Sequence, residues 1–328
     1  MTGPTDALAD VGDRVLFARL ERPKTADLTR IAIVGDPHVA TRSRGTHRVF
    51  HRTEQRLRAV IDDVNQRDVD LVVVPGDLTK DGEPWNYDRV DALLDELVAP
   101  FLATPGNHDL RTRGDEHDCP SAAAFADRYA SGSLPVRHRL GEIELFVVNS
   151  SAGSDGPYAD THRGCVSERQ LEWLGAELAG ATTPVVVSHH NPFPIVSEPL
   201  CTVGPWETFT IRDRHRLHSV LENHSVSLVV AGHHHLPSLV KRGGIRQLIA
   251  PATASYPQAY CLLEVDETGT NVWLVSHASE SGRDEAYELA ADGPAFRRSL
   301  LGITESMLDD LPVLYEPPRV DGEPLIGE

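Results

Sequence analysis

The sequence predicts a mixed α/β fold, a four-layer α-β-β-α sandwich in which two mixed sheets pack together and helices cover them. Short apolar runs alternate with amphipathic helical stripes from residue 31 to about residue 230, and closely spaced apolar runs then follow in series. With 328 residues, of which 40% are hydrophobic, the chain can bury a large core. We find no linker and no internal repeat, and we therefore expect one folded unit.

The first half of the chain repeats a unit of apolar strand, polar turn and amphipathic helix. Strands are expected at the short apolar runs 31–34, 71–74 and 101–104. A helix is expected after the first strand, because apolar side chains recur at i, i+3, i+4 and i+7, namely at Leu57, Val60, Ile61 and Val64. The same stripe predicts a helix through Val90, Leu93, Leu94 and Leu97.

The second half continues this alternation and then changes to strands in series. Residues 122–129 are expected to be helical, and residues 143–148 to form a strand. The run Ser167-Glu168-Arg169-Gln170 matches a capping box that opens another helix. A further helix is expected around Leu217, and further strands at 185–187, 228–230, 238–241, 245–250, 259–265 and 271–276.

The two ends of the chain are expected to lie outside the main domain, which we place at residues 30–280. Residues 1–29 are expected to be a lead-in with a short helix that ends before Pro23. Residues 281–328 are expected to be an extension that packs on the domain. It is helical at first and then extended, because a long helix would be broken by Pro312, Pro317 and Pro318.

Charge and composition exclude several classes of partner. The formal net charge of −18 disfavours a nucleic acid polymer or an anionic membrane surface. No apolar run is long enough to cross a bilayer, and residues 1–20 have no signal-peptide core. Widely spaced cysteines are typical of reduced thiols in the cytoplasm, where we expect this protein, and we assign no metal to Cys119, Cys165, Cys201 or Cys261. A homodimer is left open.

Five predicted loops share one feature, because each follows an apolar strand and carries Asp, Asn or His. Ligands bind at the carboxyl ends of strands in α/β folds, so we expect these loops to meet at one place. Each loop alone is more often a capped turn or a satisfied polar pair. Five of them together are not expected by chance and predict a metal site. Their residues are Asp36, His38, Asp77, Asn107, His108, His189, His190, His233 and His235.

The mixture of residue types indicates which metals are expected. Carboxylate, amide oxygen and imidazole ligands together suit Mn, Fe, Zn or Co better than Ca or Mg alone. There are too many ligands for one ion, and one bridging carboxylate is the economical way to hold two. Two divalent ions about 3.5–4 Å apart clamp a phosphoryl group and acidify a bound water. Their charge would also attract a phosphate to an acidic protein.

Five motifs occur in a set order: Asp36-Pro37-His38, Gly76-Asp77, Gly106-Asn107-His108-Asp109, His189 and Gly232-His233-His234-His235. This order resembles the calcineurin-like metallophosphoesterases, and most of all their class III cyclic nucleotide phosphodiesterase and glycerophosphodiesterase branch. Further agreement is seen at Gly82-Glu83-Pro84, Gln170-Leu171-x-Trp173-Leu174 and Arg212-Asp213. The resemblance covers about residues 30 to 265.

The resemblance implies a role for each matched residue. A first metal ion would be held by Asp36, His38, Asp77 and His235. A second would be held by Asp77, Asn107, His189 and His233. Asp77 would therefore bridge the two ions, and a hydroxide between them would attack phosphorus, so that no side-chain nucleophile is needed. His108 would contact the phosphate and protonate the leaving oxygen.

Other residues are left open by the sequence. The branch often reads His-His-Pro-Pro where this chain has His189-His190-Asn191-Pro192; alignment on the pair favours His189 as the ligand. Arg111 and Arg113 are candidates for substrate contact, although a solvated arginine is commoner. The long segment 191–210 is a candidate substrate wall, in which packing is the commoner role for Trp206 and Phe209. We leave His47, His51 and His117 unassigned and expect His234 to be a spacer.

The function predicted is a dinuclear metal-dependent phosphodiesterase that hydrolyses small phosphodiesters, with 3′,5′-cyclic nucleotides as candidate substrates. A phosphomonoesterase or protein phosphatase on the same site is the nearest alternative. A nuclease is disfavoured by the acidic charge and the lack of a basic stripe. A metal-free binding scaffold is disfavoured because it would not need the full ligand set.

Overall fold

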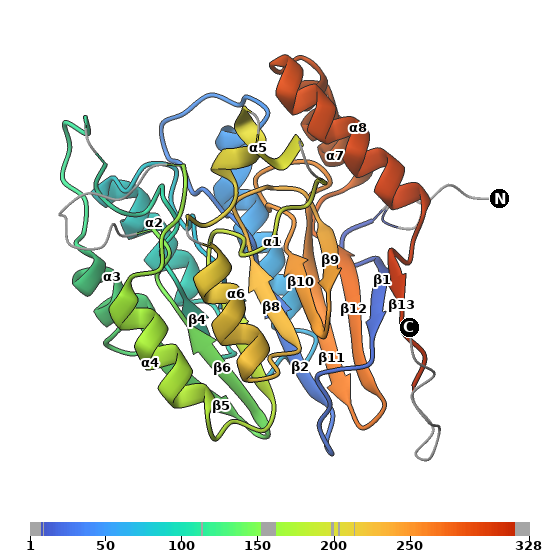
Figure 1. Cartoon of the computed structure of the whole chain (residues 1–328). Coiled ribbons are helices and arrows are strands. Elements are labelled where there is room, and N and C mark those ends of the chain that lie inside the picture. Colours follow the sequence, from blue (N-terminus) through green and yellow to red (C-terminus); the bar gives the residue numbers. More distant parts are fainter. Residues whose placement is uncertain are drawn as a thin grey trace.

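The computed structural model describes residues 8, 10–112, 114–151, 162–197, 200–202, 204–212 and 214–318. It confirms the predicted fold class, since two mixed sheets pack together and helices cover their outer faces (Figure 1). The larger sheet has seven strands. Their spatial order is β13 (Leu314–Tyr315), β1 (Arg14–Leu20), β12 (Gly269–Ser276), β11 (Ala259–Asp266), β2 (Thr29–Ile33), β3 (Leu71–Val74) and β4 (Phe101–Ala103).

The smaller sheet has six strands. Their order is β5 (Val136–Leu140), β6 (Ile143–Val147), β7 (Pro184–Val187), β8 (Leu228–Ala231), β10 (Ile245–Ile249) and β9 (Ser238–Arg242). Strands β2, β3 and β4 run parallel, and so do β6, β7, β8 and β10. Within each sheet the carboxyl ends of these strands therefore lie together, where an α/β fold binds its ligands.

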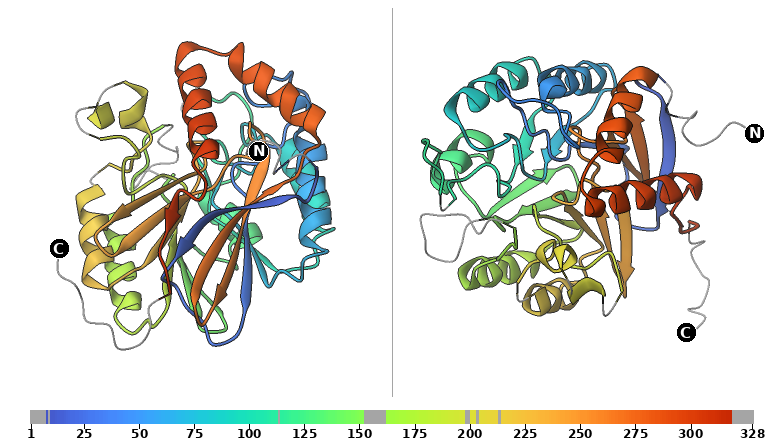
Figure 2. Two further views of the ribbon diagram at one scale, coloured as in Figure 1. Left: turned by 90° about the vertical axis from the view of Figure 1, so that its right-hand side faces the viewer. Right: turned by 90° about the horizontal axis from the view of Figure 1, so that it is seen from above.

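Three helices cover the seven-stranded sheet: α1 (Thr53–Val64), α2 (Pro84–Leu94) and α3 (Ala122–Tyr129). The six-stranded sheet is covered by α4 (Glu168–Leu178) and α6 (Arg214–Asn223). Figure 2, in its right-hand view, shows the blue and cyan helices on one side of the sheets and the yellow-green and gold helices on the other. The predicted stripe of α1 is buried against the sheet through Leu57, Val60, Ile61 and Val64.

The central core lies between the two sheets. It is filled by aliphatic side chains from both, among them Ile33, Val73, Val187 and Val230, each at most 1% exposed. Burying one such side chain contributes about 1.5–3 kcal/mol. The strands are thus held firmly, and their carboxyl-terminal loops start from fixed positions.

The lead-in expected before Pro23 contains no α-helix among its described residues, of which Leu8 alone is in a 3-10 helical conformation. Residues Arg14–Leu20 instead form strand β1, which pairs with β12 and β13 inside the larger sheet. Phe17 and Leu20 are fully buried in the central core. Leu, Ala and Arg favour a helix locally, but strand pairing and core burial outweigh that preference here. The helix prediction was therefore wrong at Arg14–Leu20, and residues 1–7 and 9 lie outside the described residues.

Of the two hydrogen bonds that make up the predicted capping box, only the one accepted by the Ser167 side chain is formed. The Ser167 side chain accepts a hydrogen bond from the Gln170 backbone N–H and begins α4. The Gln170 side chain does not return to the cap. Its amide instead accepts from the N–H of Asn149 and donates to the carbonyl of Asn149, each at 2.8 Å, and so fixes the end of β6 to α4.

The segment after β12 folds back over the carboxyl ends of the strands. It forms α7 (Glu280–Ala291) and α8 (Ala295–Asp309), at the top right of Figure 1, and ends in β13. Leu308 of α8 reaches the central core. Part of the long segment 191–210 forms a short 3-10 helix, Leu200–Thr202, and helix α5, Pro205–Thr208. None of the described helices is long and apolar enough to cross a membrane.

Candidate metal centre

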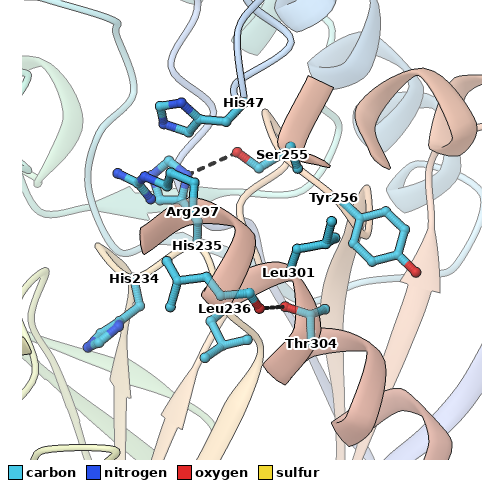
Figure 3. Close-up of a pocket in the computed structure, with 11 residues that line it drawn as sticks. His47, His234, His235, Leu236, Ser255, Tyr256, Arg297, Leu301 and Thr304 are labelled. Atoms are coloured by element: carbon cyan, nitrogen blue, oxygen red, sulfur yellow. Dashed lines mark hydrogen bonds between the residues drawn. The ribbon is translucent and has the colours of Figure 1, made fainter. Parts of the chain in front are cut away.

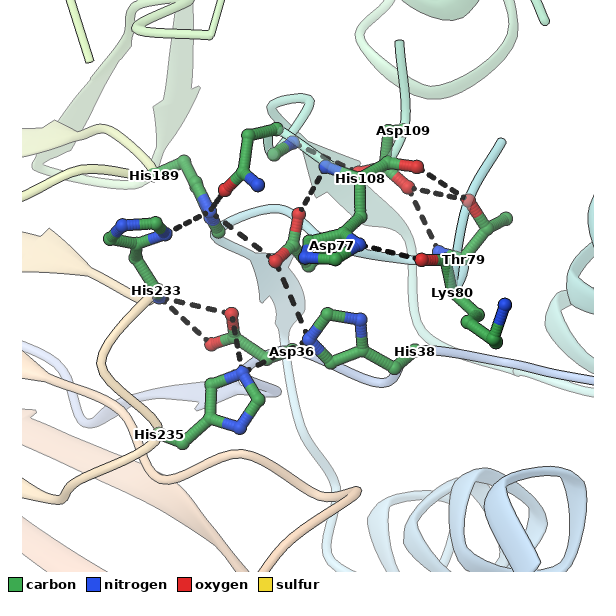
Figure 4. Close-up of polar contacts among 12 residues, drawn as sticks. Asp36, His38, Asp77, Thr79, Lys80, His108, Asp109, His189, His233 and His235 are labelled. Carbon is green, nitrogen blue, oxygen red and sulfur yellow. Dashed lines mark hydrogen bonds and ion pairs between the residues drawn. The ribbon is translucent and has the colours of Figure 1, made fainter. Parts of the chain in front are cut away.

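The five loops predicted from the sequence meet at one place, directly after β2, β3, β4, β7 and β8 (Figure 4). The side chains brought together are almost all buried. Asp36, His38 and His189 are fully enclosed, whereas His108 keeps partial exposure. Polar side chains are buried in this way only where they have partners, so the cluster has to satisfy itself internally or through a bound group.

Four of the residues form what we call the first group, namely Asp36, His38, Asp77 and His235. The Nε2 atoms of His38 and His235 lie 3.0 Å apart. His38 Nε2 lies 3.4 Å from Asp77 Oδ2, and His235 Nε2 lies 3.7 Å from Asp36 Oδ1. Four potential ligand atoms therefore point toward one small volume, as a metal ion requires.

The second group consists of Asp77, Asn107, His189 and His233. His189 Nε2 lies 3.2 Å from Asn107 Oδ1, 3.1 Å from His233 Nδ1 and 3.5 Å from Asp77 Oδ2. Figure 4 shows Asp77 between His189 on one side and His38 on the other. The same oxygen, Asp77 Oδ2, is thus within 3.5 Å of a histidine from each group.

The hydrogen bonds around His189 test whether a cation fits. Its Nδ1 lies 2.7 Å from the Pro75 carbonyl, which only accepts, so Nδ1 carries the hydrogen. The neutral ring then has a lone pair on Nε2, and this atom faces the Asn107 oxygen and a nitrogen of His233. The Asn107 oxygen only accepts, so it repels the lone pair on His189 Nε2, and a metal ion between the two atoms would turn that repulsion into coordination. The donor set fits a cation.

Backbone conformation points to the same residues. Nine described residues other than glycine have a positive φ, and five of them belong to the two groups: Asp36, His38, Asp77, His233 and His235. Such conformations cost on the order of 1–3 kcal/mol each and persist where the surroundings impose them. Strain concentrated at one cluster is typical of a functional site.

Two glycines permit the loops to approach this closely. A Cβ on Gly106 would lie 2.0 Å from Asp77 Oδ1, and a Cβ on Gly232 would lie 2.7 Å from Asp36 Oδ2. Both distances are shorter than any real contact of a Cβ atom. In both cases the atom that would clash belongs to a predicted metal ligand. Glycine is therefore required where the loop of β4 meets that of β3, and where the loop of β8 meets that of β2.

The electrostatics also favour a bound cation. Burial, followed by the nearby Asp77 carboxylate, raises the pKa of Asp36 well above its usual value, and burial raises the pKa of Asp77 to about 7. Burial lowers the pKa of His189 to about 4, and it lowers the pKa values of His38 and His235 well below their usual range. Neutral imidazoles with free lone pairs beside destabilised carboxylates form a site that positive charge would stabilise.

Asp109 is a supporting residue that the sequence analysis left without a role. Its carboxylate accepts hydrogen bonds from the N–H groups of Leu78, Thr79 and Gly106, at 2.9 to 3.1 Å. It therefore ties the Asp77 loop to the Asn107 loop. Its place directly after Asn107-His108 was the one signal available. A second supporting contact links His235 Nδ1 to Ser255 Oγ at 3.0 Å.

His108 lies at the edge of the cluster. Its backbone N–H donates to Asp77 Oδ1 at 2.9 Å, and its Nδ1 donates to the Lys80 carbonyl at 2.6 Å. The ring meets that of His38 edge to face, with centroids 4.8 Å apart. Because Nδ1 is occupied, Nε2 is the atom left for a substrate.

The two neighbouring histidines have different hydrogen-bond partners, although the potential ligand atoms of His189, His190 and His233 all lie within 4.8 Å of one another. His189 contributes Nε2 to the second group, whereas His190 Nδ1 pairs with Ser150 Oγ at 3.0 Å. The His190 ring nevertheless lies 4.3 Å from the His233 ring, and its buried Nε2 has no hydrogen-bond partner among the described residues. The geometry therefore favours His189 as the ligand beside Asp77 and places His190 next to it.

Of the remaining candidates, Phe209 borders the second group, since its ring meets that of His233 edge to face with centroids 5.4 Å apart. Arg111 is exposed, and Arg113 lies outside the described residues. Phe209 stacks on His234 and Phe296, and Trp206 packs edge to face on Phe296, so the two aromatic residues of the long segment have the packing role. His51 pairs with Glu285 on α7.

Another set of potential ligand atoms lies in the loop after β4, within 4.8 Å of one another, on Asp115, His117 and Cys119. All three residues are partly exposed. His117 Nε2 donates to the Asp81 carbonyl at 2.7 Å, and Cys119 Sγ approaches the same carbonyl at 3.7 Å. We assign no function to this set.

Comparisons with known proteins agree with this geometry. The family model described as calcineurin-like phosphoesterase matches residues 29–237. A probable cyclic nucleotide phosphodiesterase from Synechococcus sp. is 28% identical over 75% of this chain and 88% of its own length. A cAMP/cGMP dual specificity phosphodiesterase from Mycobacterium tuberculosis is 28% identical over 61% of this chain, and the match covers 60% of that protein. A glycerophosphodiester phosphodiesterase from Enterobacter lignolyticus is 28% identical over 58% of this chain and 65% of its length.

The solved structure of a dimetal phosphatase from Danio rerio has the same fold. It superposes with a TM-score of 0.60 at 16% identity, over 76% of this chain and 97% of that protein. The family model spans well over half of the chain, from β2 to the loop after β8 that carries His233 and His235. The chain therefore belongs to the calcineurin-like phosphoesterase family and is a phosphoester hydrolase.

Proposed function

We propose that this hydrolase is a dinuclear metal-dependent phosphodiesterase for small diesters, with 3′,5′-cyclic nucleotides as candidate substrates. The observation that carries the proposal is the position of Asp77, whose Oδ2 lies 3.4 Å from His38 and 3.5 Å from His189. One carboxylate shared by two sets of ligands is the arrangement that two ions require. The cyclic nucleotide phosphodiesterases among the relatives support the choice of substrate.

Two divalent ions, for which we propose Mn, Fe, Zn or Co, would act as Lewis acids on the phosphoryl oxygens and supply an activated water. Asp36, His38 and His235 would hold one ion, and Asn107, His189 and His233 the other, with Asp77 common to both. The ligands bring only two carboxylates, so the loaded site would be positively charged. That local charge would attract a phosphate despite the net charge of −18.

The chain's own contribution at the leaving group is assigned to His108. Its Nδ1 is held by the Lys80 carbonyl, which orients Nε2 for contact with a phosphoryl or leaving oxygen. Burial, and then the charge of Arg48, lower the pKa of His108 well below its usual value, so the free ring is neutral. An anionic substrate beside the ring would raise that pKa and allow Nε2 to carry the proton that the leaving oxygen needs.

The test compares bis(p-nitrophenyl) phosphate with p-nitrophenyl phosphate on protein stripped of metal and reloaded with Mn²⁺. The proposal predicts a higher kcat/KM for the diester, and turnover of 3′,5′-cyclic AMP. A higher kcat/KM for the monoester would transfer the function to the alternative, a phosphomonoesterase or protein phosphatase. No metal-dependent turnover of either compound would contradict both.

Compartment and assembly form part of the same proposal. None of the four cysteines, all of which lie among the described residues, forms a disulfide bond, which fits the proposed reducing cytoplasm. We include a homodimer in this proposal, because a two-fold dimer is the commonest assembly of protein chains, and light scattering of the purified chain measures the oligomeric state directly.

A further inference from the structure

A small cavity lies beside the first group, on the side covered by the C-terminal helices (Figure 3). Its volume is about 40 Å³. His235 lines it together with Ser255, and α8 closes it from the other side through Arg297 and Leu301. A predicted metal ligand and an arginine more than 60 positions later in the chain therefore face the same space.

Arg297 is largely enclosed and has no ion-pair partner in the described part of the chain; the opposite charge that acts on it is that of Asp36, which a bound metal ion would neutralise. Its guanidinium forms no ion pair and no side-chain hydrogen bond there. Burial, followed by the positive charge of Arg48, lowers its pKa to about 10, so it stays charged at neutral pH. An enclosed charge without a partner is costly and marks a place for an anion.

Arg48 brings a second positive charge to the same region. Its buried Nε has no hydrogen-bond partner, and its guanidinium lies 5.9 Å from the ring centroid of Phe50. That ring in turn packs edge to face on His38 of the first group, at 6.4 Å. The charges of Asp36 and Asp77 act on Arg48, but these carboxylates would be neutralised once metal ions are bound. Arg48 then also lacks a counter-ion.

The two segments that carry these arginines lie against each other. A Cβ built on Gly293, in the turn before α8, would lie 3.3 Å from the Cβ of Arg297 and 3.7 Å from the Cβ of His47. The loop that carries His47 and Arg48 is thus packed against the start of α8. Because both arginines start from packed backbone segments, less of the chain has to be ordered when a ligand binds.

The size and charge of the space indicate what it accepts. A water molecule needs about 10–15 Å³ of such volume, so the cavity has room for about three small heavy atoms. A carboxylate has three heavy atoms, whereas a phosphate has five. Arginine recognises a carboxylate through paired hydrogen bonds.

We propose that Arg297, assisted by Arg48, forms a subsite for a carboxylate on the substrate, next to the phosphoryl group held at the metal centre. This inference rests on the proposed function and deepens it. The substrates then include phosphoesters with a second, carboxylic acid group on a short arm. The C-terminal extension takes part in substrate selection through Arg297.

Binding of non-hydrolysable phosphonates tests the subsite without turnover. Calorimetry on the Mn²⁺-loaded protein compares phosphonoacetate and 3-phosphonopropionate with methylphosphonate and propylphosphonate, which lack the carboxylate. We expect at least one carboxylate compound to bind about tenfold more tightly than its matched control. The carboxamide of that compound should lose the advantage, because it has nearly the same size and shape without the charge.

Three variants assign the effect to Arg297. Arg297→Met should abolish the tenfold ratio, and Arg297→Lys should keep part of it. Arg298→Met, an exposed neighbour on the same helix, should leave the ratio unchanged. Metal content measured by mass spectrometry before and after the titration shows whether each variant stays loaded and whether the ligand has removed metal.

The outcomes separate the subsite from the function on which it rests. Equal affinities of the carboxylate compounds and their controls in the wild-type protein would overturn the subsite. So would an unchanged ratio in Arg297→Met. Diester turnover together with either result would leave the phosphodiesterase proposal intact, whereas tight carboxylate binding without any ester turnover would overturn the phosphodiesterase and keep the anion site.

Discussion

The two ligand groups differ in charge although they share Asp77. The first group has two carboxylates, from Asp36 and Asp77, and two imidazoles. The second has no carboxylate of its own and uses the neutral amide of Asn107. A divalent cation is held more strongly where more anionic ligands surround it. We therefore expect the first ion to bind tightly and the second to exchange.

The two groups also differ in backbone strain. In the first, all four ligand residues have a positive φ, between 42° and 65°. In the second, Asn107 and His189 do not. Strain at every ligand indicates that the first group is imposed by the surrounding fold, so that it is preorganised for its ion. We therefore expect the first group to keep its ion at all times and the second group to be filled only when the concentration of free metal is high enough.

The largest effect is expected from Asp77→Ala, which removes the only ligand shared by both groups. Metal content should fall for both ions, and diester turnover should fall by more than about 1000-fold, because Lewis-acid stabilisation worth several kcal/mol is lost. Mass spectrometry and a p-nitrophenyl assay measure the two quantities. Asp81→Asn, on the same loop, is the control. Full activity in Asp77→Ala would refute the shared-ligand assignment.

His108→Ala should separate chemistry from metal binding. Both ions should be retained, while kcat should fall by about 100- to 10,000-fold for substrates with a poor leaving group. The loss should be smaller for p-nitrophenolate, which leaves without a proton. Equal losses for alkyl and nitrophenyl leaving groups would show that His108 acts by some means other than proton transfer.

Asn107→Ala tests the second group alone. The variant should bind the second ion about 10- to 100-fold more weakly and recover much of its activity when Mn²⁺ is raised. The first ion should remain bound after dialysis against a weak chelator. Loss of both ions together in this variant would contradict the distinction between the groups.

Ser255→Ala tests the first group more gently, since it removes only the hydrogen bond that orients His235. We expect the first ion to bind about tenfold more weakly and the affinity for the second ion to stay the same. A competition titration with a coloured chelator measures both constants. An effect on the second ion of equal size would mean that the groups are not separable.

Glu316→Gln should lower the free energy of unfolding and leave the metal binding of both groups unchanged. Burial alone would raise the pKa of Glu316, but hydrogen bonds from Arg246 and Lys241 outweigh it and lower that pKa from 4.5 to about 2. The carboxylate therefore stabilises the fold fully above pH 4.5, and this contribution is lost as the pH falls through about 2. Urea denaturation of the metal-free variant should show a loss of about 1–3 kcal/mol at pH 7 that shrinks toward pH 3. Altered metal content would contradict the assignment.

Sequence reasoning identified most of the fold because its strands are short and apolar on both faces. Leu71–Val74 and Leu228–Ala231 are such runs, and no local pattern competes with them. The wrong prediction at Arg14–Leu20 has the opposite cause, since its residues favour a helix and only pairing with β12 makes it a strand. Strand β5 was not predicted, because Val136–Leu140 carries polar residues at an exposed sheet edge.

For the site, the ligand candidates could be named because each directly follows a strand. The structure adds contacts between loops, which the spacing of residues along the sequence does not reveal. Asp109 binds three backbone N–H groups from two loops, which no linear pattern states. In the sequence, Arg297 reads as an ordinary surface residue on the polar face of an amphipathic helix. Only the folding of α8 over the strand ends brings Arg297 to the cavity that His235 also lines.

Counting metal ions tests the central claim most directly. The metal-stripped chain is titrated with Mn²⁺, and the ions bound per chain are measured by equilibrium dialysis and mass spectrometry. The account predicts two ions per chain, one tight and one weaker, and a reduced affinity for both in Asp77→Ala. One ion per chain at saturation, or two whose affinities do not depend on Asp77, would contradict it.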